Sequence, residues 1–442
     1  MKSIYFLLIL IAGHSAVARS ALADNWPHWR GPTGNGTSLT ATPPTEWSET
    51  KNVQWKVPIA GKSSGSPVVW GDRVFVVTAI PDASAQPSSP PPPSDRQRGG
   101  RRGRGSQPIV KMQFRVLCFN RENGELLWDE LAIESKPHEG THSTNGFASA
   151  SPCTDGKHVY AHFGSRGLYC YTIDGELKWS RTDFSKMQTR ATFGEGSSPT
   201  LVDDMIIVPY DHEGPSKLYA LNKLTGEIVW ETDRDEPTCW ATPLIVGSGE
   251  NRQIVMNGQT SARGYDLASG KELWKCAGQT QRPVATPVAN DDFVYVGSGY
   301  RGAFLGAFKL DGSGNIEGTD AVAWTINRDT PDIASFLLSE NRLYYHKAKT
   351  GILACVEAST GKPFFAEERL PEIRTTYASP IAAGGYVFST GRSGTTVVIK
   401  DSETPEVVSV NSVGEGVDAT PAAADNQLFI RGEKHLFCIA AE

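Results

Sequence analysis

A short motif recurs along this chain at an almost constant spacing, and the repeat constrains the fold more than any other feature. A small residue is followed by Ser or Thr and then, in seven of eight copies, by Pro. The copies are Gly65-Ser66-Pro67, Ala150-Ser151-Pro152, Ser197-Ser198-Pro199, Ala241-Thr242-Pro243, Ala285-Thr286-Pro287, Ala334-Ser335-Phe336, Ala378-Ser379-Pro380 and Ala419-Thr420-Pro421. Successive third positions lie 85, 47, 44, 44, 49, 44 and 41 residues apart. A period of roughly 40 to 50 residues is typical of the blades of a β-propeller.

One period shows how each unit is built. Residues 195–230 contain short apolar or alternating runs, Met205–Val208 and Lys217–Leu221 among them, separated by turn signals such as Asp203-Asp204. This pattern predicts four short antiparallel strands, which need neighbouring copies to bury their faces. The sequence therefore predicts an all-β, eight-bladed propeller of four-stranded blades.

A second signature marks the ends of the blades, a Gly with an aromatic residue four positions later. It occurs as Gly124/Trp128, Gly175/Trp179, Gly226/Trp230, Gly270/Trp274 and Gly361/Phe365. The last blade ends at Phe437-Cys438-Ile439 without a fourth strand, whereas Asn52–Val57 is a strand-like segment with no blade of its own. We expect this N-terminal strand to close the ring and so remove an exposed sheet edge.

These repeats resemble those of the pyrroloquinoline quinone (PQQ) repeat propellers, and the Asp266…Gly270-Lys271…Trp274 spacing is similar to the tryptophan-docking motif of that family. The resemblance covers about residues 52–440. It implies the fold, but it does not imply one function, because the family includes both quinoprotein dehydrogenases and a propeller lipoprotein of outer-membrane protein assembly.

The first residues read as an export signal. Lys2 precedes an apolar run over residues 4–12, and Ala21-Leu22-Ala23 is a cleavage motif. We therefore expect residues 1–23 to be a signal peptide cleaved after Ala23, and a periplasmic or secreted protein with no transmembrane span. No Cys lies near the cleavage point, so we expect no lipid anchor, unlike the assembly lipoprotein. The net charge of −6 gives no indication of nucleic-acid binding by the folded body.

We divide the remaining chain into a lead segment, 24–50, and a single propeller domain, 51–442. The lead segment holds Trp26-Pro27-His28-Trp29-Arg30, which either packs on the side or base of the propeller or contacts a ligand. Residues 81–108 interrupt the first blade with a Pro-rich and then Arg/Gly-rich stretch of five Arg and two Asp. We expect this insertion to be disordered, either without a fixed partner or gripping an anionic polymer.

Seven cysteines are present, an odd number for an exported protein. Cys118 and Cys355 each lie six residues before a turn Gly, where other blades carry a small residue, which indicates buried unpaired thiols. The state of Cys153, Cys239 and Cys276 stays open at this stage, including a Cys239–Cys276 disulfide.

Candidate site residues lie where the blades differ, because a position repeated in every blade indicates architecture. The loops that feed the innermost strands meet at one rim of the channel. They carry nine ligand-binding candidates: His142, Asn145, Glu195, Trp240, Arg282, Asp332, Arg374, Tyr377 and Asp418. Aromatic walls with a few convergent polar groups suit a small-molecule or peptide site, although a water-filled channel is the alternative. The pairs His138/His142 and His158/His162 lack a third ligand, so we predict neither a metal site nor any catalytic residue.

We therefore predict an exported, monomeric, non-catalytic binding or scaffolding protein for a protein or envelope polymer. One alternative is a PQQ-dependent dehydrogenase, which the family resemblance implies would need PQQ, calcium and a carboxylate base. Vicinal cysteines and long insertions of that family are missing here. Another alternative is a glycan-recognising module that uses Trp240 and Tyr377. If the protein is a non-catalytic binding or scaffolding protein, we expect no cofactor.

Overall fold

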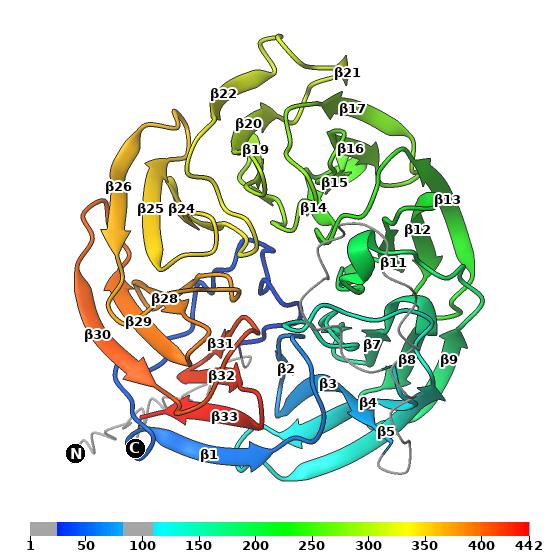
Figure 1. Cartoon of the computed structure of the whole chain (residues 1–442), viewed down its shortest axis with the longest axis vertical. Helices are drawn as coiled ribbons and strands as arrows, with labels where there is room; N and C mark the ends of the chain where they lie inside the picture. The colour runs from blue at the N-terminus through cyan, green and yellow to red at the C-terminus, as the bar shows by residue number, and fades with distance from the viewer. Residues whose placement is uncertain (1–23, 83–108, 442) are drawn as a thin grey trace, which may run out of the picture.

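The computed structural model describes residues 24–82 and 109–441, so the predicted signal peptide and most of the predicted insertion lie outside the described residues. Eight antiparallel sheets surround one axis, which confirms the predicted eight-bladed propeller (Figure 1). Each sheet corresponds to one copy of the repeat, and its innermost strand directly follows the small-hydroxyl-Pro motif.

The first four blades run in chain order from the innermost strand to the outermost. Their strands are β2 (Val68–Trp70), β3 (Arg73–Pro81), β4 (Met112–Asn120) and β5 (Leu126–Ser135); β6 (Cys153–Thr154), β7 (His158–His162), β8 (Leu168–Thr172) and β9 (Leu177–Arg181); β10 (Thr200–Val202), β11 (Met205–Tyr210), β12 (Ser216–Asn222) and β13 (Ile228–Arg234); and β14 (Leu244–Val246), β15 (Gln253–Met256), β16 (Ala262–Asp266) and β17 (Glu272–Cys276).

The last four blades follow the same order. Their strands are β18 (Val288–Ala289), β19 (Phe293–Ser298), β20 (Phe304–Lys309) and β22 (Val322–Ile326); β23 (Leu337–Ser339), β24 (Arg342–His346), β25 (Ile352–Glu357) and β26 (Pro363–Arg369); β27 (Ile381–Ala383), β28 (Tyr386–Thr390), β29 (Thr395–Lys400) and β30 (Val407–Ser412); and β31 (Ala422–Ala424), β32 (Gln427–Arg431) and β33 (His435–Ala440), completed by β1 (Val53–Pro58). Short 3-10 turns occupy Gly164–Arg166, Arg190–Thr192 and Gly249–Asn251.

Two features of this arrangement concern the sheet edges. β1 pairs antiparallel with β33, from Val53 opposite Ile439 to Pro58 opposite His435, as predicted for ring closure. The short strand β21 (Gly314–Asn315) pairs with the outer edge of β17 from the neighbouring blade. Sequence analysis missed β21, because a two-residue strand has no periodicity of its own.

The hydroxyl groups of the repeated motif join all eight blades around the axis. The backbone N–H of each motif hydroxyl residue donates a hydrogen bond to the hydroxyl oxygen of the equivalent residue in the next blade, at 2.8–3.2 Å. We call this closed circle the hydroxyl ring, and its members are Ser66, Ser151, Ser198, Thr242, Thr286, Ser335, Ser379 and Thr420. The ring explains why every blade carries Ser or Thr there, since a buried N–H needs an acceptor.

Tryptophans near the rim of the disc join five of the eight pairs of neighbouring blades. The indole N–H of a Trp in one outer strand donates to a backbone carbonyl in the next blade at 2.9–3.2 Å, as seen for Trp55, Trp128, Trp179, Trp230 and Trp324. The Trp ring also covers the turn glycine of that blade. A Cβ on Gly226 would lie 2.6 Å from Trp179, and Gly226 has φ +74°, so only glycine suits this turn.

Apolar side chains fill the space between neighbouring blades. Phe75 and Phe114 of the first blade, for example, form one cluster with Val159 and Tyr171 of the second. All seven cysteines are buried and unpaired, including Cys239 and Cys276, which leaves no disulfide in the structure. None of the helical turns within residues 24–82 and 109–441 has the length and apolar character needed to cross a membrane.

The hydroxyl ring predicts the effect of removing one hydroxyl. Ser198→Ala leaves the buried N–H of Ser151 without its acceptor at 2.9 Å, which should lower the free energy of unfolding by about 1–3 kcal/mol. Chemical denaturation followed by Trp fluorescence measures this. Ser248→Ala, at an exposed Ser whose side chain makes no cap hydrogen bond, is the matched control. Equal stability of the two variants would contradict a structural role for the ring.

Candidate functional site: a closed axial well

The lead segment closes one end of the axial channel. Trp26 exchanges two backbone hydrogen bonds with Val69, at 2.9 Å each, and the carbonyls of Pro27, Asn35 and Gly36 accept bonds from three further blades. These contacts fall on innermost strands, and Figure 1 shows the segment crossing the centre of the ring. The segment also reaches the turns that follow two of these strands, opposite the loops that feed them, because Gly71 N–H donates to the Asn25 side chain and Thr42 N–H donates to the Asp425 carbonyl. Of the two predicted roles for this segment, packing on the base is therefore observed.

Arg30 fixes this plug from inside. Its guanidinium is fully buried and donates to the carbonyls of Pro380 (3.1 Å), Asn35 (3.2 Å) and Phe336. No ion pair of the described residues includes Arg30, and burial lowers its pKa to about 9. Burial and the adjacent Arg30 charge lower the pKa of His28 to about 3, so His28 is neutral.

A cavity of about 370 Å³ lies above this plug and opens at the opposite rim. Its wall includes seven members of the hydroxyl ring and the aromatic side chains of Trp29, Phe193, Trp240, Tyr300 and Tyr377. Trp29 comes from the lead segment and lies at the closed end. We call this cavity the axial well, because the plug makes it a blind pocket instead of an open channel.

Six of the nine predicted site residues line the axial well: His142, Asn145, Trp240, Arg282, Tyr377 and Asp418. Glu195 and Asp332 do not line it, because each carboxylate is buried in an ion pair. Arg374 is exposed and is also absent from the lining. Sequence analysis missed Thr144, Phe193, Tyr300 and Lys349, and it named Trp29 only within a lead segment that packs on the propeller or contacts a ligand. Thr144 lies in the predicted loop, but the blade alignment contains no signal for the others.

The carboxylates around the well are neutralised by arginines. Glu195 accepts from the Arg166 guanidinium at 2.5 Å and from both the N–H and the hydroxyl of Ser165. Asp418 accepts two bonds from Arg392, at 2.6 and 3.0 Å, and this contact raises the pKa of Arg392. Carboxylates held in this way are poor general bases and poor metal ligands.

Two of these arginines also cover tyrosines of the wall. The Arg282 guanidinium lies 3.4 Å from the ring centroid of Tyr300 and pairs with Asp332 at 3.3 Å. The Arg392 guanidinium lies 4.1 Å from the ring centroid of Tyr377. One face of each tyrosine is therefore occupied by a cation, which is a favourable contact.

The surroundings of His142 at the mouth of the well affect its pKa. Its Nδ1 lies 2.8 Å from the Thr144 hydroxyl, and its ring meets Phe193 edge-on at 5.0 Å between centroids. Burial lowers its pKa, and so do the positive charges of Lys349, Arg282, Arg392 and Lys62. His142 therefore lies among cations, although the chain as a whole has a net charge of −6.

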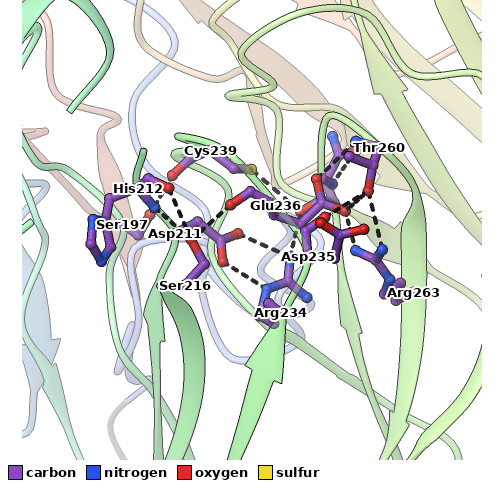
Figure 2. Close-up of polar contacts among 12 residues, drawn as sticks. Ser197, Asp211, His212, Ser216, Arg234, Asp235, Glu236, Cys239, Thr260 and Arg263 are labelled. Atoms are coloured by element: carbon purple, nitrogen blue, oxygen red, sulfur yellow. Dashed lines mark hydrogen bonds and ion pairs between the residues drawn. The ribbon is translucent and has the colours of Figure 1, made fainter. Parts of the chain in front are cut away.

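A buried polar network links the third and fourth blades beside the connector that carries Trp240, and Figure 2 shows the residues of this network. Asp211 and Arg234 form a two-fold ion pair at 2.7 and 2.9 Å, with side chains 1 % and 0 % exposed. Arg234 also donates to the Tyr265 hydroxyl at 2.6 Å and to the Asn257 carbonyl at 3.3 Å. A second buried pair, Glu236 with Arg263, anchors the start of the connector that carries Trp240.

The connector is fastened at its other end as well. Cys239 donates its thiol hydrogen to the Asn257 carbonyl at 3.3 Å, and the Asn257 amide donates to the carbonyls of Ala285 and Gly297. The indole N–H of Trp240 donates to Gly194 at 2.7 Å. Trp240 is therefore a rigid part of the wall.

Breaking the buried Asp211–Arg234 ion pair should lower the stability of the protein far more than breaking an exposed ion pair. Asp211→Asn leaves the buried Arg234 charge without its counter-ion and should lower the free energy of unfolding by about 3–5 kcal/mol. Glu46→Gln breaks the exposed Glu46–Lys51 pair and should cost about 1 kcal/mol or less. Thermal and urea unfolding of both variants measure the difference. If both variants lost a similarly small free energy of unfolding, the buried pair would not be required for stability.

The residues of the well do not fit calcium-bound PQQ. Across the described ranges, no group of three or more His, Cys, Asp or Glu side chains is placed to hold a metal ion. Three carboxylates predicted for the rim, Glu195, Asp332 and Asp418, are each bound to an arginine. These guanidinium groups compete with calcium for the carboxylate oxygens that calcium prefers as ligands.

Comparison with known proteins agrees with this fold. No curated protein sequence matches the chain. The solved structure of BamB from Moraxella catarrhalis is similar with a TM-score of 0.52 at 13% identity, covering 74% of this chain and 93% of that one. The computationally designed Ika8 protein gives 0.52 at 13% identity, covering 76% and 94%. Quinohemoprotein alcohol dehydrogenase from Comamonas testosteroni gives 0.59 at 9% identity, covering 96% and 82%.

At these identities the solved structures establish the fold alone. A family model described as outer membrane protein assembly factor BamB matches residues 113–367, which is more than half of the sequence. This chain therefore belongs to the BamB-like family of PQQ-repeat β-propellers.

Proposed function

We propose that this protein is an exported, non-catalytic binding protein of the cell envelope that docks a partner protein at the open face of the axial well. The observation that carries the proposal is the well itself, a blind pocket whose wall combines aromatic side chains with cations. Concave sites of this kind bind ligands through a few convergent polar groups on an apolar wall.

The chemistry of the well supports binding in preference to catalysis. A general base needs a carboxylate or histidine with free lone pairs within reach of a substrate. The carboxylates of Glu195, Asp332 and Asp418 are each held by an arginine. The family model is described as an assembly factor, which also suggests an envelope-associated protein that binds other proteins.

The outer strands supply a second contact surface. Exposed apolar side chains gather there: Leu126, Leu127, Leu131, Leu177, Ile228, Val229, Val407, Val408 and Val410. The edge of β17 already accepts β21 as an added strand. These edges could extend an interface beyond the mouth, because an unpaired sheet edge accepts a strand from another chain.

Site-specific photocrosslinking in intact cells tests the docking face. A photoreactive residue at Lys349 or Arg374, on the mouth loops, should give the same protein adduct, identified by mass spectrometry. A photoreactive residue at Leu39, which is 86% exposed and belongs to the plug at the opposite end, should not give that adduct. Adducts of equal yield from Leu39, or none from the mouth, would overturn the proposal.

A titration with PQQ and calcium tests the dehydrogenase alternative. Because the carboxylates are engaged by arginines, we expect no saturable change in Trp fluorescence and no calcium-dependent rise in melting temperature. Trp240→Ala is measured in parallel, since Trp240 would be the aromatic floor in that alternative. Micromolar binding that needs calcium and is lost in the variant would contradict the non-catalytic reading.

A further inference from the structure

The geometry points to the ligand class of the axial well: we propose that it takes an acidic peptide segment of the partner, with an aromatic side chain of that segment inside the well. This inference rests on the proposed docking function and adds the chemistry of the partner. Three observations carry it, namely the cations of the mouth, the unpaired donors of the well and the size of the pocket.

The loops that surround the mouth are rich in cations. They carry Lys62, Arg190, Arg282, Arg301, Lys349, Arg374 and Arg392. Arg282 and Arg392 are paired with carboxylates, whereas the other five appear in no ion pair of the described residues. The same loops also carry Glu139, Glu213, Glu372 and Glu433, but none of these lines the well, whereas Arg282 and Lys349 do. Cations that line a concave site raise the local concentration of anionic ligands.

The well also contains donors that lack acceptors. Nε1 of Trp29, at the closed end, and Nε of Arg282, in the wall, are both buried without a hydrogen-bond partner among the described residues. A buried donor without an acceptor costs about 1–3 kcal/mol, so a ligand that supplies acceptors relieves this cost. A carboxylate only accepts hydrogen bonds, so a ligand that carries carboxylates can satisfy such donors, and Lys349 of the lining is a further cation for it to meet.

The size of the well indicates a side chain instead of a folded element. About 370 Å³ lies near the lower end of the range of about 300–1,000 Å³ seen for small-ligand pockets. Phe193 and Trp240 offer apolar surface for a ring. Large elements cannot enter, and Trp29 at the closed end blocks passage through the disc.

A peptide explains the spread of the cations better than a free small anion does. Lys349 and Arg282 line the well, but Arg190, Arg301 and Arg374 lie on the surrounding loops outside its lining. A ligand that contacts both groups must extend across the rim. A neutral glycan leaves these charges without a partner, and guanidinium groups already cover one face of Tyr300 and of Tyr377.

Fluorescence anisotropy with synthetic peptides tests the inference. The probe is a dye-labelled peptide in which Asp and Glu flank one Phe, and its binding to the purified protein should weaken as salt rises. Lys349→Gln and Arg374→Gln should each weaken binding roughly two- to fivefold, and Trp240→Ala at least about tenfold. Lys157→Gln, an exposed Lys in the turn between β6 and β7 at the opposite end, is the matched control and should not change it.

The peptide variants distinguish the possible failures. Equal binding of the peptide with Asn and Gln would overturn the role of charge, and equal binding of the peptide with Ala for Phe would overturn insertion of the ring. Displacement by free citrate at equal affinity would identify a small anion, and binding of a neutral oligosaccharide that needs Trp240 would identify a glycan. Each of these results overturns the peptide proposal.

If the acidic peptide does not bind, this result alone does not contradict the proposed docking function. If no peptide binds but mouth positions still crosslink to one protein, the acidic class is wrong and docking stands. If both experiments fail, both proposals are wrong. A lower melting temperature in Trp240→Ala leaves the test decisive, because Lys349 and Arg374 are exposed and their variants should keep the stability of the parent protein.

Discussion

The hydroxyl ring is the interaction on which the rest of the structure depends. Eight strands converge on one axis, and each brings a backbone N–H into a space that water cannot fully reach. One hydroxyl per blade satisfies the N–H of its neighbour, so each blade depends on the next and the last on the first. Small residues before the hydroxyl let the strands approach closely enough for this contact.

The tryptophans of the outer strands constrain how neighbouring blades are oriented. They fix the angular relation between blades by a hydrogen bond and by contact with a glycine that has no side chain to obstruct it. Where the fifth blade lacks the glycine turn, Trp274 turns inward to Gln253, and β21 covers the outer edge of β17 instead. The outer strands of the sixth and seventh blades contain no Trp, so the tryptophan bond joins five of the eight junctions.

The lead segment changes what the ring can do. Without Trp29 and Arg30, the axis would be an open channel lined mainly by hydroxyls. With them it becomes a blind well with an aromatic end and two unpaired donors nearby. The carboxylates of Glu195, Asp332 and Asp418 are each paired with an arginine. Cations of the mouth that have no such partner, such as Lys349, can therefore attract an anionic ligand. Because the carboxylates are paired and some cations and donors are not, the well should favour a ligand that is rich in hydrogen-bond acceptors.

The sequence by itself determined the architecture, because repetition at a fixed spacing leaves few folds that bury each unit. Eight blades, closure by residues 52–57 and the structural role of the Ser/Thr positions were all predictable for that reason. It also predicted that function lies where the blades differ, and six of the nine candidates, such as Trp240 and Asp418, do line the well.

Only the tertiary structure decided which charges are free and where the channel ends. Glu195 and Asp332 appear in the sequence as candidate ligands, but their partners Arg166 and Arg282 are 29 and 50 residues away. Such pairings depend on loop geometry, which no repeat encodes. Trp29 precedes the first repeat, so the alignment of blades could not place it, and its position follows from packing against strands that are remote in sequence.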